Sequence, residues 1–347
     1  MEVIYDLAVI GGGPAGSATA ITAARAGKSV LLLEKGRYPR HKVCGEFVSP
    51  ESHEVLADLL GRDHSLLRTP PQITQARMFV DGTCLIFALP QPAWSIPRFD
   101  LDHALWHASI AAGATCRDVT SVQSISAHSL QIEGQEIKTK LVINASGRWS
   151  NLHRPSLIES GPRWIGLKAH FAGEQAPPST DIYFFEGGYC GVQPIADNKI
   201  NASAMVRADV ATSLAEVFAA HPGLWLRSRA WEQCTETVTT SPLIHRAPEP
   251  VTNGVMNAGD AAAFIDPYTG DGISLALRSG VLAAQCATSG GPDRYAREYQ
   301  QRFARAFKTA AFTRKLSRAP KSVRRMAEFA FQSDFLKRWA LEHTRGA

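Results

Sequence analysis

Asp6-Leu7-Ala8-Val9-Ile10-Gly11-Gly12-Gly13-Pro14-Ala15-Gly16 is the stretch that decides the fold of this chain. The apolar residues before the turn fit a strand buried on both faces of a parallel sheet, and the small residues 17–26 fit a tightly packed helix. Gly11 permits a tight turn, Gly13 lets the backbone approach a pyrophosphate, and Gly16 lets the helix lie close to the strand. The pattern predicts a dinucleotide site, with Pro14 and Ala15 at the start of a helix whose N-terminal end directs free N–H groups at the anion.

An acidic residue, Glu34, follows the next apolar run, Val30-Leu31-Leu32-Leu33. A carboxylate at this place accepts hydrogen bonds from a ribose diol and disfavours a 2′-phosphate, so the adenosine belongs to FAD or NAD before NADP. Because strand, turn, helix, second strand and acid occur in this order, we favour a nucleotide site over a purely conformational turn.

Composition places the chain among ordinary soluble proteins. It has 347 residues, 45% hydrophobic and 20% charged, which is enough for two packed lobes. Its six cysteines show no C-x-x-C spacing, which is typical of a reducing cytoplasm and disfavours a disulfide framework or a zinc ribbon. The first strand begins close to Met1 and no apolar run approaches about 18 residues, so we expect a cytoplasmic protein without a signal peptide or transmembrane segment.

The C-terminal end is strongly basic. Residues 301–347 carry 12 Lys or Arg and 3 Asp or Glu, in a chain of net charge +5. We expect helices here that pack on the nucleotide domain. The alternative is docking on a membrane surface or a carrier protein, because Phe329, Phe335, Leu336 and Trp339 interleave with the charges. We expect no nucleic-acid partner.

The loop after Glu34 is polar and irregular, and long loops in compact domains tend to be functional. Within it, Cys44-Gly45 is suited to approach a flavin ring; the plainer interpretation of Cys44 is a small buried side chain without a redox role. A helix over 50–68 is predicted next, and then a hairpin over 76–80 and 84–89.

Arg98 stands just before a predicted helix that runs through Ala111. It is placed to reach a phosphate or to order the flavin, and the alternative is a surface ion pair with Asp100 or Asp102. His103 and His107 share a face of this helix, but no third ligand stands out, so we read them as ordinary helix residues and predict no metal site.

The remaining chain alternates between strands and loops before ending in helices. Short strands are expected over 115–147, and the last of them ends in the small residues Ala145-Ser146-Gly147, where a ligand can pass closely. Residues 164–242 read as a β-rich substrate wall whose aromatics mostly form core. A strand then leads into Gly259-Asp260, and a helix opens at about Leu275, with the N–H groups of Gly272-Ile273 directed at a flavin pyrimidine.

Three separated motifs together resemble the p-hydroxybenzoate hydroxylase-like flavoproteins, and within them the geranylgeranyl-reductase-like branch. The likeness lies in Gly11 to Gly16 with Glu34, in Lys42-x-Cys44-Gly45-Glu46 and Arg98-x-x-x-Asp102, and in Gly259-Asp260-Ala261-Ala262 through Asp266-Pro267-x-x-Gly270-x-Gly272-Ile273. It covers about residues 1–290 and implies FAD, with NAD(P)H as a transient reductant. The cofactor contacts implied are Gly11, Gly13, Pro14, Ala15, Gly16, Glu34, Lys35, Cys44, Gly45, Arg98, Val119, Gly147, Gly259, Asp260, Gly270, Gly272 and Ile273.

Departures from these families bear on the reaction. Ser146-Gly147 stands where the aromatic monooxygenases have Asp-Gly, and Ala263 where they often have His. Tyr189-Cys190-Gly191-Val192-Gln193-Pro194 lacks two large apolar groups of the geranylgeranyl reductase run Tyr-x-Trp-x-Phe-Pro. Flavin halogenases have a Trp-x-Trp-x-Ile-Pro run that Trp94-Ser95-Ile96-Pro97 only echoes, and no matching catalytic lysine is evident.

We therefore expect an FAD-dependent oxidoreductase that acts on a hydrophobic small molecule or an acyl, isoprenoid or polyketide-type metabolite. The leading hypothesis is a reductase or dehydrogenase with hydride transfer through flavin N5. The alternatives are a flavin monooxygenase of an aromatic or polyketide substrate that uses NAD(P)H and O2, and a non-catalytic FAD-binding protein. Cys44, Glu46 and Tyr189 are catalytic candidates by placement alone.

The expected fold class is α/β, with a Rossmann-type FAD-binding domain, a second β-sheet substrate domain and a helical C-terminus. We assign residues 1–70, 96–155 and 250–290 to the FAD domain, 71–95 and 156–249 to the substrate domain, and 291–347 to C-terminal helices. We expect a monomer that binds a small-molecule substrate, carrier-tethered or lipid-like.

Overall fold

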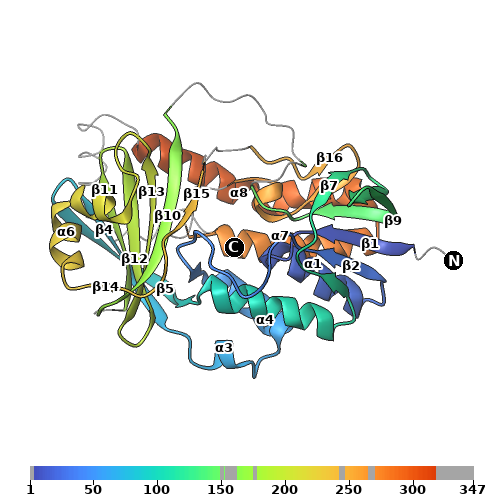
Figure 1. Cartoon of the computed structure of the whole chain (residues 1–347), viewed down its shortest axis with the longest axis horizontal. Helices are drawn as coiled ribbons and strands as arrows, with labels where there is room; N and C mark the ends of the chain where they lie inside the picture. Colours follow the sequence, from blue (N-terminus) through green and yellow to red (C-terminus); the bar gives the residue numbers. More distant parts are fainter. Residues whose placement is uncertain are drawn as a thin grey trace.

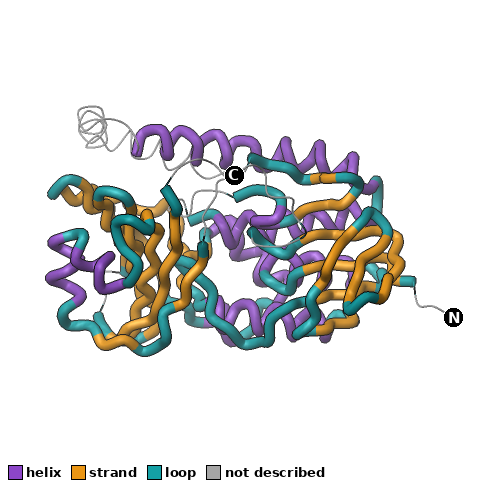
Figure 2. The backbone as a smooth tube through the Cα atoms, turned by 45° about the horizontal axis from the view of Figure 1, so that its top comes forward, coloured by secondary structure: helices purple, strands orange, loops and turns teal. Residues whose placement is uncertain are grey.

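The computed structural model describes residues 4–148, 152, 162–174, 178–241, 247–264 and 270–317. These residues form two β-sheets at opposite ends of an elongated molecule, and helices connect the two ends (Figure 1). Figure 2 shows the long last helix, α8 (Gly291–Ser317), running along one side from the first sheet toward the second. The expected α/β fold with two sheets and a helical end is confirmed. Residues 318–347, which hold most of the basic end, lie outside the described part.

The sheet nearer the N-terminus is the nucleotide-binding type. Its central order is β16-β17-β9-β1-β2-β6, with β7 and β8 attached beside β9, and β1 pairs in parallel with β2 and β9. Its strands are β1 (Tyr5–Ile10), β2 (Val30–Leu33), β6 (Thr115–Arg117), β7 (Val122–Ile125), β8 (Ser129–Ile132), β9 (Gln135–Asn144), β16 (Val251–Thr252) and β17 (Val255–Asn257).

Alternate residues of β1 fill two separate cores, as a doubly covered strand requires. Leu7 and Val9 pack with helix residues such as Ala15 and Tyr295, whereas Ala8 and Ile10 pack with the β7–β8 side. The helices of this lobe are α1 (Pro14–Arg25), α4 (Arg98–Ala111), α7 (Gly272–Thr288) and α8, together with the short turn η2 (Gly259–Ala261).

The second sheet has nine strands in the order β14-β10-β13-β12-β11-β4-β5-β3, with β15 beside β10. The strands are β3 (Phe47–Val48), β4 (Gln72–Val80), β5 (Thr83–Ser95), β10 (Trp164–Ala172), β11 (Ser179–Phe185), β12 (Gly188–Ala196), β13 (Lys199–Arg207), β14 (Glu232–Gln233) and β15 (Val238–Thr240). Helices α5 (Leu214–Ala219) and α6 (Pro222–Ser228) pack on one face of it.

The two faces of this second sheet differ in burial. Residues such as Ala169, Val192 and Ala204 form a core with α5 and α6. Their neighbours along each strand point to the other face, where Ile182, Phe184, Tyr189, Gly191 and Met205 are only half-buried. We call these five residues the open sheet face; it is largely apolar.

Two expected helices have different bounds. The single helix over 50–68 is wrong: the segment forms η1 (Pro50–Ser52), α2 (His53–Leu60) and α3 (Ser65–Arg68), and Gly61 ends α2 with φ +92°. The late helix begins at Gly272 and not near Leu275, because the Leu275 N–H already donates to the Asp271 carbonyl. Among the described residues, no helix combines the length and apolar character needed to cross a membrane.

Candidate active site

Two glycines of the first turn are required by the protein's own packing. Gly11 has φ +100°, and a Cβ there would lie 2.3 Å from the Ala145 carbonyl oxygen. A Cβ on Gly16 would lie 1.7 Å from the Gly11 carbonyl oxygen. The turn can therefore form only if both positions lack a side chain, which agrees with the tight turn and the close helix approach that the sequence predicts.

Of the glycines that the sequence places around the dinucleotide, four border open space. A Cβ on Gly13 would meet nothing nearer than Arg98 Nη2 at 3.7 Å, and a Cβ on Gly45, Gly147 or Gly272 would meet no atom within 4 Å. The sequence places all four around the dinucleotide. Since the described residues do not fill the space beside them, these positions fit a cofactor whose phosphates and ring approach the backbone closely.

Glu34 is fixed beside the turn. Its carboxylate accepts hydrogen bonds from the Gly12 N–H at 3.0 Å and the Gly36 N–H at 2.9 Å, and it pairs with Arg40 Nη2 at 2.7 Å. The side chain is 5% exposed. Tyr38 donates its hydroxyl to the Gly12 carbonyl, which ties the following loop to the turn. Glu34 thus has the rigidity that a ribose acceptor needs, and that role stays a prediction.

Arg98 lies next to the turn and is not in a surface ion pair. Its Nε and Nη2 atoms bind the two carboxylate oxygens of Asp102 at 2.6 and 2.7 Å, and Asp102 is completely buried. Burial alone would lower the pKa of Arg98, but the Asp102 carboxylate raises it well above its ordinary value. A permanently charged guanidinium is therefore held beside Gly13, where a diphosphate would lie.

Lys42 adds a titratable cation to this region. Burial and the charges of Arg40 and Arg98 lower its pKa to about 8, and Glu34 and Asp102 only partly oppose them. A bound diphosphate would stabilise the ammonium form and raise this pKa. FAD binding should therefore take up a proton, and affinity should fall as pH rises above about 8.

We predict that the dissociation constant for FAD rises about tenfold between pH 7 and pH 9.5. Fluorescence titration of the FAD-free protein measures it. Lys42→Met should bind FAD more weakly at pH 7 and lose most of the pH dependence. An unchanged pH slope in that variant would assign the proton to another group.

The flavin-side loop is held by the second sheet. Asn201 on β13 donates from Nδ2 to the carbonyls of Cys44 and Gly45, both at 3.0 Å. The Glu46 N–H donates to Cys44 Sγ at 3.3 Å, and burial raises the pKa of the thiol, which stays protonated near neutral pH. Asn201 Oδ1 and Ser49 Oγ are buried without a hydrogen-bond partner among the described residues, which suits a site completed by a ligand.

Gly45→Ala tests whether the ring approaches this loop. Because the new Cβ meets no protein atom within 4 Å, the free energy of unfolding of the FAD-free protein should change by less than about 1 kcal/mol. The rate of flavin reduction or the FAD content should nevertheless fall several-fold, as stopped-flow and absorbance measurements would show. Wild-type values for both would place the ring elsewhere.

Glu46 lies in a buried cluster of charges between the two lobes. Its Oε1 accepts hydrogen bonds from Lys168 Nζ at 2.7 Å and from the Arg98 N–H at 3.0 Å, and its Oε2 pairs with His170 Nε2 at 2.8 Å. Burial would raise the pKa of Glu46, but His170 and Lys168 outweigh it and hold that pKa below its ordinary range. With both oxygens engaged, Glu46 fixes the loop to β10.

The sequence reasoning missed Lys168, His170 and Asn201. The sequence of β10 does contain an indication of two of them. Lys168 and His170 are two residues apart in an otherwise apolar strand, so their side chains lie on the same face of it. Tyr189 lies on the open sheet face, with its ring centroid 5.8 Å from that of Phe184.

The other residues predicted to contact the cofactor lie in η2, at the start of α7, and just after β2 and β6. Gly259 starts η2, donates its N–H to Ser279 Oγ at 2.9 Å, and precedes Asp260; Gly272 and Ile273 open α7. Gly270 packs against Phe47. Val119 has φ +51° and is exposed beside the strand end that bonds Glu34, and Lys35 is exposed as well. Residues 265–269, with Asp266 and Pro267, lie outside the described residues.

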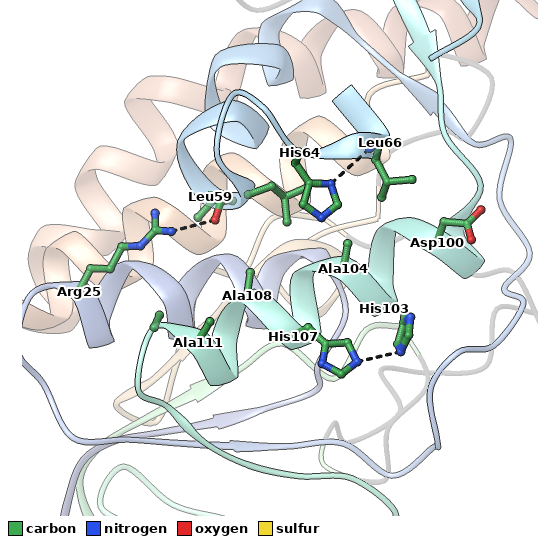
Figure 3. Close-up of a pocket in the computed structure, with 12 residues that line it drawn as sticks. Arg25, Leu59, His64, Leu66, Asp100, His103, Ala104, His107, Ala108 and Ala111 are labelled. Atoms are coloured by element: carbon green, nitrogen blue, oxygen red, sulfur yellow. Dashed lines mark hydrogen bonds between the residues drawn. The ribbon is translucent and has the colours of Figure 1, made fainter. Parts of the chain in front are cut away.

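A separate groove of about 780 Å³ lies along α4, between it and α2 and α3 (Figure 3). His103 and His107 sit at this groove with their Nε2 atoms 2.9 Å apart. No group of three or more His, Cys, Asp or Glu side chains within the described ranges is arranged to hold a metal ion. None of the glycines that border open space lines this groove.

Comparisons with known proteins agree with the geometry. The family model for FAD dependent oxidoreductases matches residues 6–39. A menaquinone reductase of Mycolicibacterium smegmatis is 29% identical, over 89% of this chain and 84% of that protein. Digeranylgeranylglycerophospholipid reductase 1 of Methanococcoides burtonii is 28% identical, over 83% and 75%. The structure of a flavin-dependent brominase superposes with a TM-score of 0.83 at 20% identity, over 99% of this chain and 94% of that one.

The cofactor and the enzyme class follow from these relatives and from the nucleotide site. The brominase supports the fold alone, whereas the family model and the two reductases extend the likeness to sequence. The chain is an FAD-dependent oxidoreductase, and its sequence is similar to digeranylgeranylglycerophospholipid reductases and a menaquinone reductase.

Proposed function

We propose that this enzyme is a reductase or dehydrogenase that moves hydride between flavin N5 and a carbon–carbon bond of a hydrophobic metabolite. The open sheet face carries the proposal, because Ile182, Phe184 and Met205 are apolar yet only half-buried on the side that supplies Asn201 to the flavin-side loop. FAD supplies the two-electron chemistry when bound. An apolar substrate would bury this face.

The relatives support a reductive reaction on such a substrate. Two of them are named as reductases, one of a menaquinone and one of a digeranylgeranylglycerophospholipid. Both compounds are largely apolar, as the open sheet face would require. The residues of this chain would bind the cofactor, hold the Cys44–Gly45 loop against β10 and β13, and exclude water.

The reductant would be NAD(P)H acting transiently, because the sequence contains one dinucleotide motif and FAD would occupy it. Glu46 then serves as a positioning residue, since both of its carboxylate oxygens are engaged by the protein. Tyr189 remains the candidate on the open sheet face that can meet the substrate.

The test is anaerobic. The FAD-loaded enzyme is reduced with NADH or NADPH and mixed without O2 with a short-chain menaquinone or a geranylgeranyl lipid, while the flavin spectrum is followed. Substrate-dependent reoxidation of the flavin and a reduced product are expected. A product that forms only with O2 and carries oxygen from labelled O2 would establish the monooxygenase alternative. A flavin that dithionite reduces but neither nucleotide reduces would contradict the proposal and favour a binding protein.

A further inference from the structure

Two histidines of α4, His103 and His107, bring their rings together at the groove along that helix (Figure 3). Their Nε2 atoms are 2.9 Å apart, their ring centroids are 4.5 Å apart, and the ring planes meet at 80°. Two unprotonated ring nitrogens this close repel each other, because each directs a lone pair toward the other. The arrangement therefore requires a cation between the rings, which is either a shared proton or a metal ion.

The angle between the two rings favours the metal ion. A linear N–H···N hydrogen bond with this nitrogen separation would place the ring centroids about 5 Å apart, so the 4.5 Å observed means that the rings meet at an angle. Two nitrogens that are each about 2.0–2.1 Å from one ion lie about 2.9 Å apart when the angle at the ion is about 90°, and about 3.3 Å apart when it is tetrahedral. The right angle is typical of Ni²⁺ and Cu²⁺, whereas Zn²⁺ prefers the tetrahedron.

The groove leaves other coordination positions of such an ion accessible. His64 lies on the opposite side of the groove, but its Nδ1 accepts the Leu66 N–H at 3.3 Å, so Nε2 carries the proton of the neutral ring and offers no lone pair. Asp100 lines the groove one turn before His103 and adds a negative charge. Two imidazoles beside a carboxylate, with water at the remaining positions, make an open metal site.

We propose that His103 and His107 bind a divalent transition-metal ion, with Ni²⁺ or Cu²⁺ preferred over Zn²⁺. The i, i+4 spacing alone fits ordinary helix residues, as the sequence predicts, so the proposal rests on the separation and angle of the rings. The site is independent of the proposed reaction, because the groove is lined by none of the residues assigned to FAD or to the open sheet face. A bound ion would connect successive turns of α4.

Calorimetry on the untagged, FAD-loaded protein with NiCl₂ and ZnCl₂ measures the two affinities. Wild type should bind one Ni²⁺ per chain, at least about threefold more tightly than Zn²⁺. His103→Gln and His107→Gln should each weaken Ni²⁺ binding at least about tenfold. His128→Gln is the matched control and should keep the wild-type affinity, because His128 is exposed and its Nδ1 lies 2.8 Å from the Lys140 carbonyl oxygen and not beside a second imidazole.

Electron paramagnetic resonance of bound Cu²⁺ reports the geometry. In a Cys84→Ser/Cys234→Ser background, which removes the two exposed thiols, the spectrum should be tetragonal with coupling to two nitrogens, and His107→Gln should leave one. Absence of Ni²⁺ binding in wild type would overturn the proposal and leave a shared proton between the rings. Equal Ni²⁺ affinities in wild type and both histidine variants would overturn it too, and tighter binding of Zn²⁺ would contradict the right angle on which it rests.

Discussion

Lys168→Met is expected to lower the free energy of unfolding of the FAD-free protein by about 3–5 kcal/mol. Lys168 and Glu46 are both 0% exposed, and Nζ lies 2.7 Å from Oε1. Methionine fills nearly the same volume, so the loss comes from charge and not from a cavity. The Glu46 carboxylate would remain buried with His170 Nε2 and the Arg98 N–H, without its closest cation. Urea unfolding followed by circular dichroism gives the value.

An exposed ion pair in the same chain is the matched control. Lys140 Nζ lies 2.8 Å from Asp6 Oδ1, but its side chain is 71% exposed, so Lys140→Met should cost less than about 1 kcal/mol. The double variant Glu46→Gln/Lys168→Met should be less destabilised than the sum of its single changes, because it leaves no unpaired carboxylate. If Lys168→Met and Lys140→Met lowered the free energy of unfolding by equally small amounts, the buried ion pair would stabilise the fold no more than the exposed one.

The Glu46–Lys168 ion pair also determines how the free energy of unfolding changes at acid pH. The pKa of Glu46 in the fold is below 4.5, so its contribution is complete above the pKa of the unfolded chain and is lost as pH falls through the folded value. Without Lys168, the pKa of Glu46 should rise. Glu46 should therefore contribute a smaller acid loss in Lys168→Met, and the difference in the free energy of unfolding between this variant and wild type should shrink as pH falls through the folded pKa of Glu46.

The sequence predicts the parts of this site whose residues lie close together along the chain. It does not predict the parts that only folding brings together. The turn, Glu34 and the start of α1 lie within one strand–helix–strand unit, so spacing and hydrophobic pattern are sufficient to place them. Glu46 and Lys168 are 122 residues apart, and only the packing of β10 against the flavin-side loop brings them together. The alternation of Lys168 and His170 indicates a polar face on β10 but not its partner.

The glycines of the first turn show what local spacing can establish. From spacing alone the sequence assigns Gly11 to the tight turn, Gly13 to the pyrophosphate and Gly16 to the close helix. The structure adds that protein atoms pack against Gly11 and Gly16, whereas Gly13 borders open space.

That separation predicts opposite outcomes for two alanine substitutions in one turn. Gly16→Ala should abolish folding or lower the free energy of unfolding by more than about 3 kcal/mol, because its Cβ would lie 1.7 Å from the Gly11 carbonyl oxygen and backbone must move. Gly13→Ala places its Cβ 3.7 Å from Arg98 Nη2, an ordinary contact, and should change that free energy by less than about 1 kcal/mol.

Gly13→Ala is the more informative variant for FAD binding, because it leaves a folded protein whose affinity for FAD can be measured. Its Cβ would enter the space beside Arg98 that a diphosphate needs, so the dissociation constant should rise at least about tenfold. Denaturant unfolding and fluorescence titration of both variants give the two quantities. A Gly13→Ala protein that binds FAD as tightly as wild type would move the diphosphate away from Arg98, and a stable Gly16→Ala protein would mean that α1 can retreat from β1. Because one turn supplies both results, the pair distinguishes a glycine needed for the fold from a glycine needed for the ligand.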